Sequence, residues 1–237
     1  LWRIERRLCF ILSFLMPNSK YLLPITGLFV AVLLISGITS TKIIDLWPFV
    51  FDGGTLLFPL SYIFGDILTE VYGYRTSRKV IWTGLASMLL MIGMIVLINF
   101  LPANADRWQQ SAYQIILMAT PRIFLGSIVA YFVGEFVNAF VLAKMKVWMQ
   151  GRHLWMRTIG STLIGQAFDT VVFVMIAFYG IMDMQTLWII IISNYIFKVW
   201  VEVILTPVTY KVIAYLKKTE ETDVYDVETN FNPFIIK

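Results

Sequence analysis

Long apolar stretches alternate with short polar ones along almost the whole chain. Six of the apolar stretches approach or exceed the roughly 20 residues that an α-helix needs to cross a bilayer. They cover residues 21–39, 54–72, 80–101, 115–143, 159–180 and 186–214. The fourth and sixth exceed that length, so we expect these helices to tilt, kink or project past the membrane. The pattern predicts an all-α integral membrane protein with six transmembrane helices.

The ends of the chain differ from this central part, residues 20–216. Residues 1–19 begin without Met, and their apolar stretch at 8–16 is too short to cross a bilayer. We expect a cytoplasmic or interfacial segment there, or an extended start upstream of Met16. Residues 217–237 are polar and rich in acids, which predicts a solvated or disordered cytoplasmic tail.

The composition supports the bilayer as the solvent. Of the 237 residues, 59% are hydrophobic and 14% are charged, whereas a soluble domain has roughly 45–50% apolar and about 25% charged residues. A soluble helical protein with an unusually large core is the less favoured alternative. The single cysteine, Cys9, excludes an internal disulfide and a thiolate metal cage, and the single histidine, His153, lies in a basic segment. We expect neither a metal nor a cofactor.

The basic residues fall on alternate sides of a six-helix topology. They cluster before the first stretch, between the second and third, between the fourth and fifth, and near the end of the sixth. Since positive residues favour the cytoplasmic side, we expect both termini in the cytoplasm. The net charge of +4 then reflects topology, and nucleic acid is not an expected partner. The basic residues of these four clusters, in chain order, are Arg3, Arg6, Arg7, Lys20, Arg75, Arg78, Lys79, Lys144, Lys146, Arg152, Arg157, Lys211, Lys217 and Lys218.

Four of the predicted helices carry charged or amide residues at spacings that place them on one helix face. A charge at the centre of a bilayer costs about 3 to 17 kcal/mol, so we expect these groups to face one another or a polar cavity. Arg122 and Lys198 can neutralise two of the acids, which leaves carboxylates free to bind a ligand. The sets are Asp66 with Glu70, Glu135 with Asn138 and Arg122, Gln166 with Asp169, and Asn194 with Lys198 and Glu202.

Structural roles for some of these groups stay open. Asp66 and Glu70 could lie near the cytoplasmic end and pair with Arg75 and Arg78. Similarly, Lys198 and Glu202 could form one salt bridge within a helix. The pairs Glu135 with Asn138 and Gln166 with Asp169 have apolar sequence on both sides, so we expect them to line a site.

An aromatic stretch precedes the second predicted helix. Trp47, Phe49 and Phe51 alternate with Pro48, and Gly53 follows. Such aromatics commonly form an interfacial belt. On a loop punctuated by Pro and Gly they could instead cover a pocket and stack on a flat ligand. The sequence leaves both readings open.

The chemistry of these residues favours binding over catalysis. No HExxH, GxSxG or nucleophile–base pair is present, so we do not expect an enzyme. Carboxylates accept from N–H groups, amides both donate and accept, and aromatics cover a flat ring. This set suits a planar heterocycle with amidine or amide edges, whereas an anion would require Arg or helix N-termini. A proton or cation pathway could use the same carboxylates.

Four ordered blocks resemble the queuosine precursor transporter family, also called the putative vitamin uptake transporter family. They are DGGTLLFPLSYIFGDILTEVYGYRTSRKVIW, YFVGEFVNAFVLAKMK, GQAFDTVVF and KVWVEVILTPVTY, and the resemblance covers roughly residues 20–216. It implies import of 7-cyano-7-deazaguanine or 7-aminomethyl-7-deazaguanine across a bacterial inner membrane. It also implies a six-helix fold similar to the substrate-binding subunits of energy-coupling-factor vitamin transporters.

The resemblance also directs the expected roles of the polar residues. We expect Glu135 or Asp169 to accept from the donor edge of the base, with an aromatic stacked on the ring. The expected cytoplasmic gate or structural network is Asp66, Glu70, Arg75 and Arg122. The full expected substrate set is Glu135, Asn138, Gln166, Asp169, Asn194, Lys198, Glu202, Trp47 and Phe51.

Three alternatives to this reading stay open. The solute could be another purine-like base or a vitamin. The chain could be a binding subunit that requires an energy-coupling partner, or it could form a homo-oligomer. A structural membrane scaffold is a less favoured class, because buried charges without a task are costly.

Overall fold

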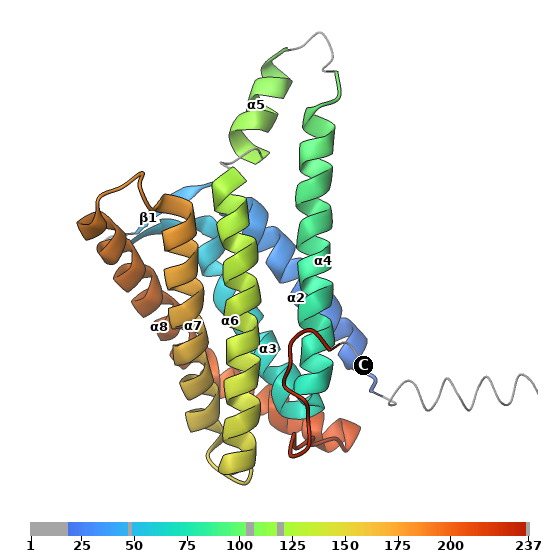
Figure 1. Ribbon diagram of the computed structural model, residues 1–237. Helices are drawn as coiled ribbons and strands as arrows, with labels where there is room; N and C mark the ends of the chain where they lie inside the picture. The colour runs from blue at the N-terminus through green and yellow to red at the C-terminus, as the bar shows by residue number, and fades with distance from the viewer. Residues whose placement is uncertain (1–18, 47–48, 103–106, 118–120, 236–237) are drawn as a thin grey trace, which may run out of the picture.

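The computed structural model describes residues 19–46, 49–102, 107–117 and 121–235. Six of the described helices lie side by side in a bundle, and α5 stands above the end of α6 (Figure 1). The helices are α2 (Leu22–Thr39), α3 (Phe58–Tyr72), α4 (Tyr74–Asn99), α5 (Arg107–Leu117), α6 (Pro121–Trp148), α7 (Leu154–Phe178) and α8 (Met184–Glu220).

The fold class predicted from hydropathy, an all-α integral membrane protein, is confirmed. Five helical stretches are long and apolar enough to cross a bilayer, and they contain α2, α4, α6, α7 and α8. The remaining predicted span, the second at residues 54–72, corresponds to α3, which has 15 residues and is about 22 Å long. That length is short of the roughly 30 Å hydrocarbon core.

Several helix boundaries differ from the predicted ones and move cations out of the loops. Only Gly73 separates α3 from α4, so Arg75, Arg78 and Lys79 lie in the first turns of α4. Gly73 has φ +81°, and a Cβ there would lie 2.6 Å from Val224 Cγ1. Helices α6 and α7 likewise extend over Lys146 and Arg157, which were expected in a loop.

The start of the predicted fourth span is also different. The chain forms the short helix α5 before α6 begins at Pro121, a position where Pro is favoured because its missing N–H costs no hydrogen bond. The prediction had placed one continuous helix from residue 115.

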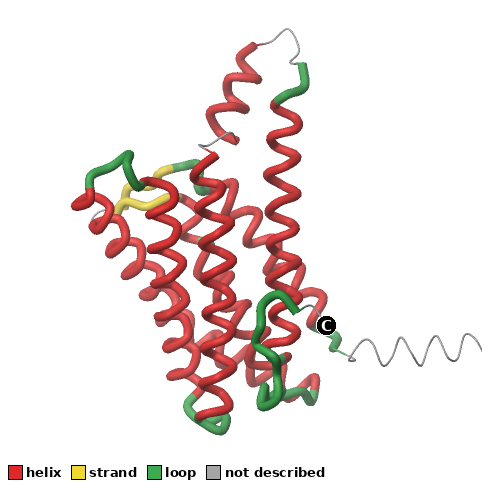
Figure 2. The backbone as a smooth tube through the Cα atoms, in the orientation of Figure 1, coloured by secondary structure: helices red, strands yellow, loops and turns green. Residues whose placement is uncertain are grey.

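A β-hairpin and a 3-10 turn connect α2 to α3. Strand β1 (Ile43–Leu46) pairs antiparallel with β2 (Phe49–Asp52), Ile43 opposite Asp52, and η1 (Gly53–Leu56) follows. Figure 2 shows this hairpin at one end of the bundle, which we call the hairpin end. The prediction for Trp47 lies outside the described residues. Phe51 is buried and stacks on Phe197 of α8 with ring centroids 4.4 Å apart.

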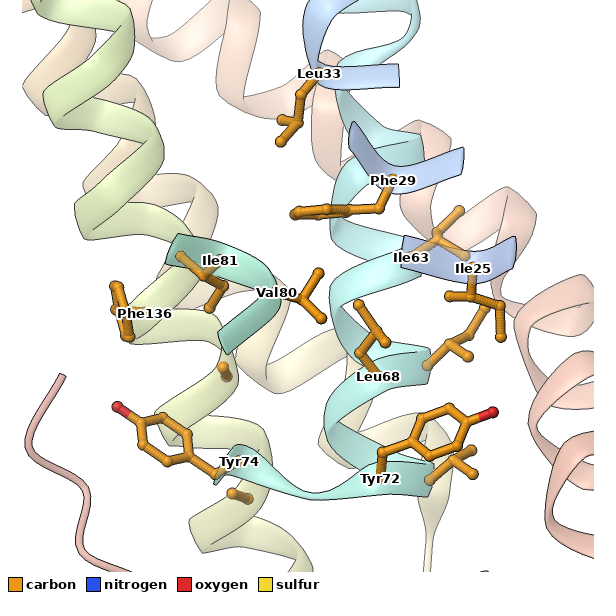
Figure 3. Close-up of a cluster of buried hydrophobic side chains, with 14 of the residues drawn as sticks. Ile25, Phe29, Leu33, Ile63, Leu68, Tyr72, Tyr74, Val80, Ile81 and Phe136 are labelled. Carbon is orange, nitrogen blue, oxygen red and sulfur yellow. The ribbon is translucent and has the colours of Figure 1, made fainter. Parts of the chain in front are cut away.

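The main hydrophobic cluster joins α2, α3, α4 and α6 (Figure 3). Phe29 and Leu33 of α2 pack toward Ile81 of α4 and Leu68 of α3. Large apolar side chains also cover the outside of the bundle, including Leu90, which is 67% exposed, and Trp200, which is 68% exposed. Apolar outer faces are what a helix requires where its neighbour is lipid.

Residues 221–235 fold back across the opposite end of the bundle, and we call them the C-terminal strap. The Tyr74 backbone N–H donates to Asp226, Arg78 donates to the Asn230 and Asn232 carbonyls, and Trp82 donates to the Pro233 carbonyl. These contacts give the tail a fixed path along the bundle, although most of its residues stay exposed, as expected of a solvated segment. In Figure 1 the strap is the dark red segment beside the start of α4, and we call this end of the molecule the strap end.

Candidate functional site

Polar side chains from α3, α6, α7 and α8 converge along the inside of the bundle. Each is at most 7% exposed, because these four helices turn their polar faces toward one another and their apolar faces outward. On α8 the buried positions include Lys198, Glu202, Thr206 and Thr209, which follow a helical spacing of three to four residues. The group from all four helices is Asp66, Glu70, Glu135, Asn138, Gln166, Asp169, Lys198 and Glu202.

Close approach of the backbones allows this convergence. Helices α6 and α7 share the most extensive interface in the molecule. A Cβ on Gly134 of α6 would contact the Tyr62 hydroxyl and lie 2.8 Å from Asp169 Cβ. Similarly, a Cβ on Gly165 would lie 2.8 Å from Asn138 Cβ, and one on Gly65 would lie 2.7 Å from Glu135 Oε2. Small residues at helix crossings are typical of membrane bundles, and here they also leave room for polar side chains.

A pocket opens into this interior toward the hairpin end. A buried ion pair lies in its wall, where Lys198 Nζ is 2.8 Å from Asp169 Oδ2. Lys198 Nζ also lies 4.4 Å from the centre of the Phe58 ring, a cation–π distance. The full lining comprises Leu33, Ser36, Gly37, Ser40, Gly54, Thr55, Phe58, Met88, Ser127, Ala130, Asp169, Thr170, Phe173, Val174, Asn194 and Lys198.

The pocket offers unused hydrogen-bonding atoms as well as rings. Asn194 donates to the Ile190 carbonyl, and its Oδ1 has no hydrogen-bond partner among the described residues. The same holds for Thr170 Oγ1. Since buried polar atoms are nearly always hydrogen-bonded, these two are available to a ligand between Phe58 and Phe173.

The structure divides the predicted substrate residues between two places. Asp169, Asn194 and Lys198 line the pocket, and Phe58 and Thr170 join them although the sequence analysis did not single them out. A second set lies deeper, between the pocket and the strap end, and does not line the pocket: Glu135, Asn138, Gln166 and Glu202. The two sets share helices, so helical spacing alone could not separate them.

The deeper set contains many polar atoms without a partner. Asn138 Nδ2 donates to Asp66 Oδ1 over 2.8 Å. In the part of the chain that the structure describes, the other Asp66 oxygen, both Glu135 oxygens, both Glu202 oxygens and both Gln166 side-chain atoms have no hydrogen-bond partner. The suggested Lys198–Glu202 salt bridge is therefore wrong, because Lys198 crosses to Asp169 instead.

An ion-pair network closes the strap end. Glu70 is fully buried and pairs with Arg157 at 2.9 Å and Lys217 at 2.6 Å, with Lys146 at 3.6 Å. Asp223 of the strap joins through Lys146 at 2.5 Å and Lys217 at 2.9 Å. We call these five residues the strap-end network. Partial burial opposes ionisation of Asp223, but hydrogen bonds from both lysines lower the pKa of its carboxyl below the usual value.

Glu70, Arg78 and Arg122 of the expected gate have other recorded partners than predicted. The cations recorded on Glu70 come from α6, α7 and α8, and Arg78 binds carbonyls of the strap. Arg75 lies exposed in the first turn of α4. Arg122 forms no ion pair with an acid among the described residues. It donates to the Ile176 carbonyl at 2.5 Å and the Tyr179 carbonyl at 2.6 Å, where α7 ends, a usual place for a cation.

Comparison with known proteins now adds the family. The profile of a transporter family described as "putative vitamin uptake transporter" matches residues 52–212. This range contains α3 to α7, and most of α8. The chain belongs to this family. The resemblance read from the four sequence blocks is thereby confirmed, and transport is a non-enzymatic role, as predicted.

Curated relatives cover most of the same region. A Bacillus subtilis protein named "Probable queuosine precursor transporter" is 32% identical over 71% of this chain and 74% of its own length. The Escherichia coli "Queuosine precursor transporter" is 26% identical over 68% of this chain and 71% of its own length. A Haemophilus influenzae protein, also named "Probable queuosine precursor transporter", is 26% identical over 68% of this chain and 67% of its own length. No solved structure matches the chain, so the expected likeness to energy-coupling-factor subunits stays a prediction.

Proposed function

We propose that this multi-pass membrane protein imports a queuosine precursor, 7-cyano-7-deazaguanine or its 7-aminomethyl analogue, across a bacterial inner membrane. The observation that carries the proposal is the pocket at the hairpin end. There the Asp169–Lys198 pair, two unpartnered polar atoms and two phenylalanine rings meet. The names of the three relatives support the same solute class.

The pocket suits the two chemical faces of a deazaguanine. Lys198 binds one oxygen of Asp169, and a carboxylate has a second oxygen that can accept from the N–H edge of the base. Asn194 Oδ1 can accept from another N–H group, and Phe58 or Phe173 can cover the ring. For the aminomethyl analogue, Lys198 would compete with the ligand cation for Asp169, so we expect tighter binding of the nitrile.

Binding to the purified protein tests the proposal. We expect 7-cyano-7-deazaguanine to bind in calorimetry. Asp169→Asn should weaken binding by about 10- to 100-fold, since a lost hydrogen bond to a charged group is worth about 1.5–3 kcal/mol, and Asn194→Ala by about 2- to 10-fold, since a neutral hydrogen bond is worth about 0.5–1.5 kcal/mol. Glu228→Gln, on the exposed part of the strap, is the matched control. Guanine as a competing ligand measures the preference for the deazapurine ring.

The outcomes separate the alternatives. Unchanged affinity in both pocket variants, with thermal unfolding like that of the wild type, would show that the solute binds elsewhere. No binding by well-folded wild type would favour another purine-like solute or a vitamin, which the family description allows. Uptake by the lone chain in vesicles decides whether an energy-coupling partner is required.

The distribution of exposed charges supports an orientation with both termini in the cytoplasm. Exposed cations gather at the strap end, among them Lys79, Lys144, Arg152 and Lys218. At the hairpin end, Asp183 begins α8, and its hydrogen bonds from the Thr186 N–H and hydroxyl lower the pKa of its carboxyl. By the positive-inside rule, the strap end faces the cytoplasm.

A further inference from the structure

Three buried carboxylates, Asp66 and the two acids of the deeper set, have no ion pair among the described residues. Asp66 is 0% exposed, and Glu135 and Glu202 are each 1% exposed. Every ion pair recorded among the described residues involves Glu70, Asp169 or Asp223 instead. Asn138 donates to Asp66 Oδ1, and the Ser61 hydroxyl, which donates to the Phe58 carbonyl, also lies near Glu135; Glu202 has no hydrogen-bond partner among the described residues. We call Asp66, Glu135 and Glu202 the carboxylate triad.

The triad brings three helices together in one place. Asp66 of α3, Glu135 of α6 and Glu202 of α8 lie close enough for their charges to interact. Among the described residues, the acids and phenols that act on them are Tyr62 and Glu70 of α3, Tyr131 of α6 and Asp169 of α7. Lys198 lies one helical turn from Glu202 on α8, but its recorded ion pair is with Asp169. Two of these acids already form ion pairs: Glu70 with Arg157 and Lys217, and Asp169 with Lys198.

Three negative charges at this place would be too costly. An ion moved from water into a protein interior loses several kcal/mol of solvation free energy even after relaxation, and like charges side by side add repulsion. Some positive species must therefore compensate the triad. The question is which species the geometry admits.

The packing around the triad favours the smallest positive species. None of the three carboxylates lines the pocket, and their burial leaves no room for a solute beside them. Among the described residues, no group of three acids, histidines or cysteines has an arrangement that could hold a metal ion. A proton requires no additional space, and a protonated carboxyl group can donate a hydrogen bond. Gln166 Oε1 and Asn138 Oδ1 are acceptors without a partner among the described residues, and such a carboxyl group could donate to them.

We propose that the carboxylate triad is the proton-binding site through which solute import is coupled to inward proton movement. The coupling rests on the transport function proposed above, whereas proton binding by the triad does not. A proton from water at the hairpin end enters through the pocket and binds a triad carboxylate. The same proton leaves to water at the strap end when the strap-end network opens, so no other reactant is required.

A neighbouring polar group lies on each side of the triad. The unpartnered Tyr62 hydroxyl lies beside Gly134, in the crossing that also holds Asp169 of the pocket wall, and it faces Glu135 and Asp66. Toward the strap end, Asp66 lies one helical turn from Glu70, which belongs to the strap-end network. The triad thus lies between the open pocket and the closed end.

Infrared spectroscopy tests proton binding without any solute. A protonated carboxylic acid has a C=O stretch distinct from that of a carboxylate. We expect this band in purified wild type at pH 7, and we expect Glu202→Gln and Glu135→Gln each to lose part of it. Glu228→Gln should leave the band unchanged. If the band is absent from the wild type, or if neither triad variant alters it, the triad does not hold protons and the proposal is overturned.

Uptake into vesicles of purified full chain tests the coupling. With the membrane potential clamped, an outside-acid gradient of one pH unit should support about tenfold accumulation of 7-cyano-7-deazaguanine for one proton per solute. In Glu202→Gln, the ratio of uptake with the gradient to uptake without it should fall to about 1. A wild-type ratio of about 1 would overturn the coupling.

Solute counterflow without a gradient keeps the two proposals apart. Counterflow in the wild type with no response to pH would retain the transport function and reject proton coupling. Absent counterflow would reject the proposed solute, and the infrared bands of the triad variants would still decide whether the triad binds protons.

Discussion

At the residue scale, the sequence identified the polar residues but not their partners. Helical spacing predicted that Asp66, Glu70, Glu135 and Asp169 face inward, and the structure buries all four. The partner of each acid depends on which helices are neighbours and at what height they cross. For that reason the sequence could offer Glu202, on the same helix, as one alternative partner of Lys198, although Lys198 binds Asp169 of α7.

Glycines at the helix crossings carry a testable consequence at the same scale. We expect Gly134→Ala to lower the midpoint of thermal unfolding and to abolish solute binding, because its methyl group would contact the Tyr62 hydroxyl and Asp169 Cβ. Overpacking of this kind typically costs about 1–3 kcal/mol. The control is Gly93→Ala in α4, where no heavy atom lies within 4 Å of the new Cβ. Equal effects of the two substitutions would contradict the close crossing of α6 and α7.

At the scale of elements, hydropathy located the six bundle helices but missed the parts that are neither long nor apolar. The short helix α5 is amphipathic, and the C-terminal strap is polar and acid-rich. Composition of that kind predicts disorder. The strap is ordered by groups far away in the sequence, such as Arg78 and Trp82, which bind its carbonyls. No local pattern reports such contacts.

The strap gives a prediction of its own. Asp226 is 4% exposed and accepts from the Tyr74 N–H and the Thr229 hydroxyl. We expect Asp226→Ala to release the strap, because an unsatisfied buried donor costs about 1–3 kcal/mol. Limited proteolysis of detergent-solubilised protein should then cut residues 221–235 faster than in the wild type. Glu228→Ala, two residues away and exposed, should be cut at the wild-type rate, and equal rates for Asp226→Ala would contradict the docked strap.

At the scale of the whole molecule, the two ends of the bundle differ. The hairpin end has a pocket that reaches Asp169 and Lys198, whereas the strap end is closed by Glu70 and its three cations. The structure therefore has one open and one closed end, as alternating access requires of a single state. Import would follow from opening the strap-end network after the pocket is filled.

Cysteine labelling measures how the whole molecule is oriented. In a Cys9→Ser background, we expect Gln185→Cys at the hairpin end to react with a membrane-impermeant maleimide added to spheroplasts. Arg152→Cys, in the turn between α6 and α7 at the strap end, should react only after lysis. Both positions are exposed in the structure. The reverse pattern would place the pocket on the cytoplasmic side and would contradict the proposed orientation.

The strap-end network also has a consequence for the order in which the protein is made. Ribosomes deliver N-terminal segments first, so Glu70 reaches the membrane before Lys146, Arg157 and Lys217 have been synthesised. Lys146 in turn precedes its strap partner Asp223. The charge of Glu70 therefore has no cation partner until Lys146 and Arg157 have been made, and its pairing with Lys217 forms last. A nascent chain that stops before Lys217 lacks two of the five members of the network, Lys217 and Asp223, so the strap end is the last part of the bundle to close.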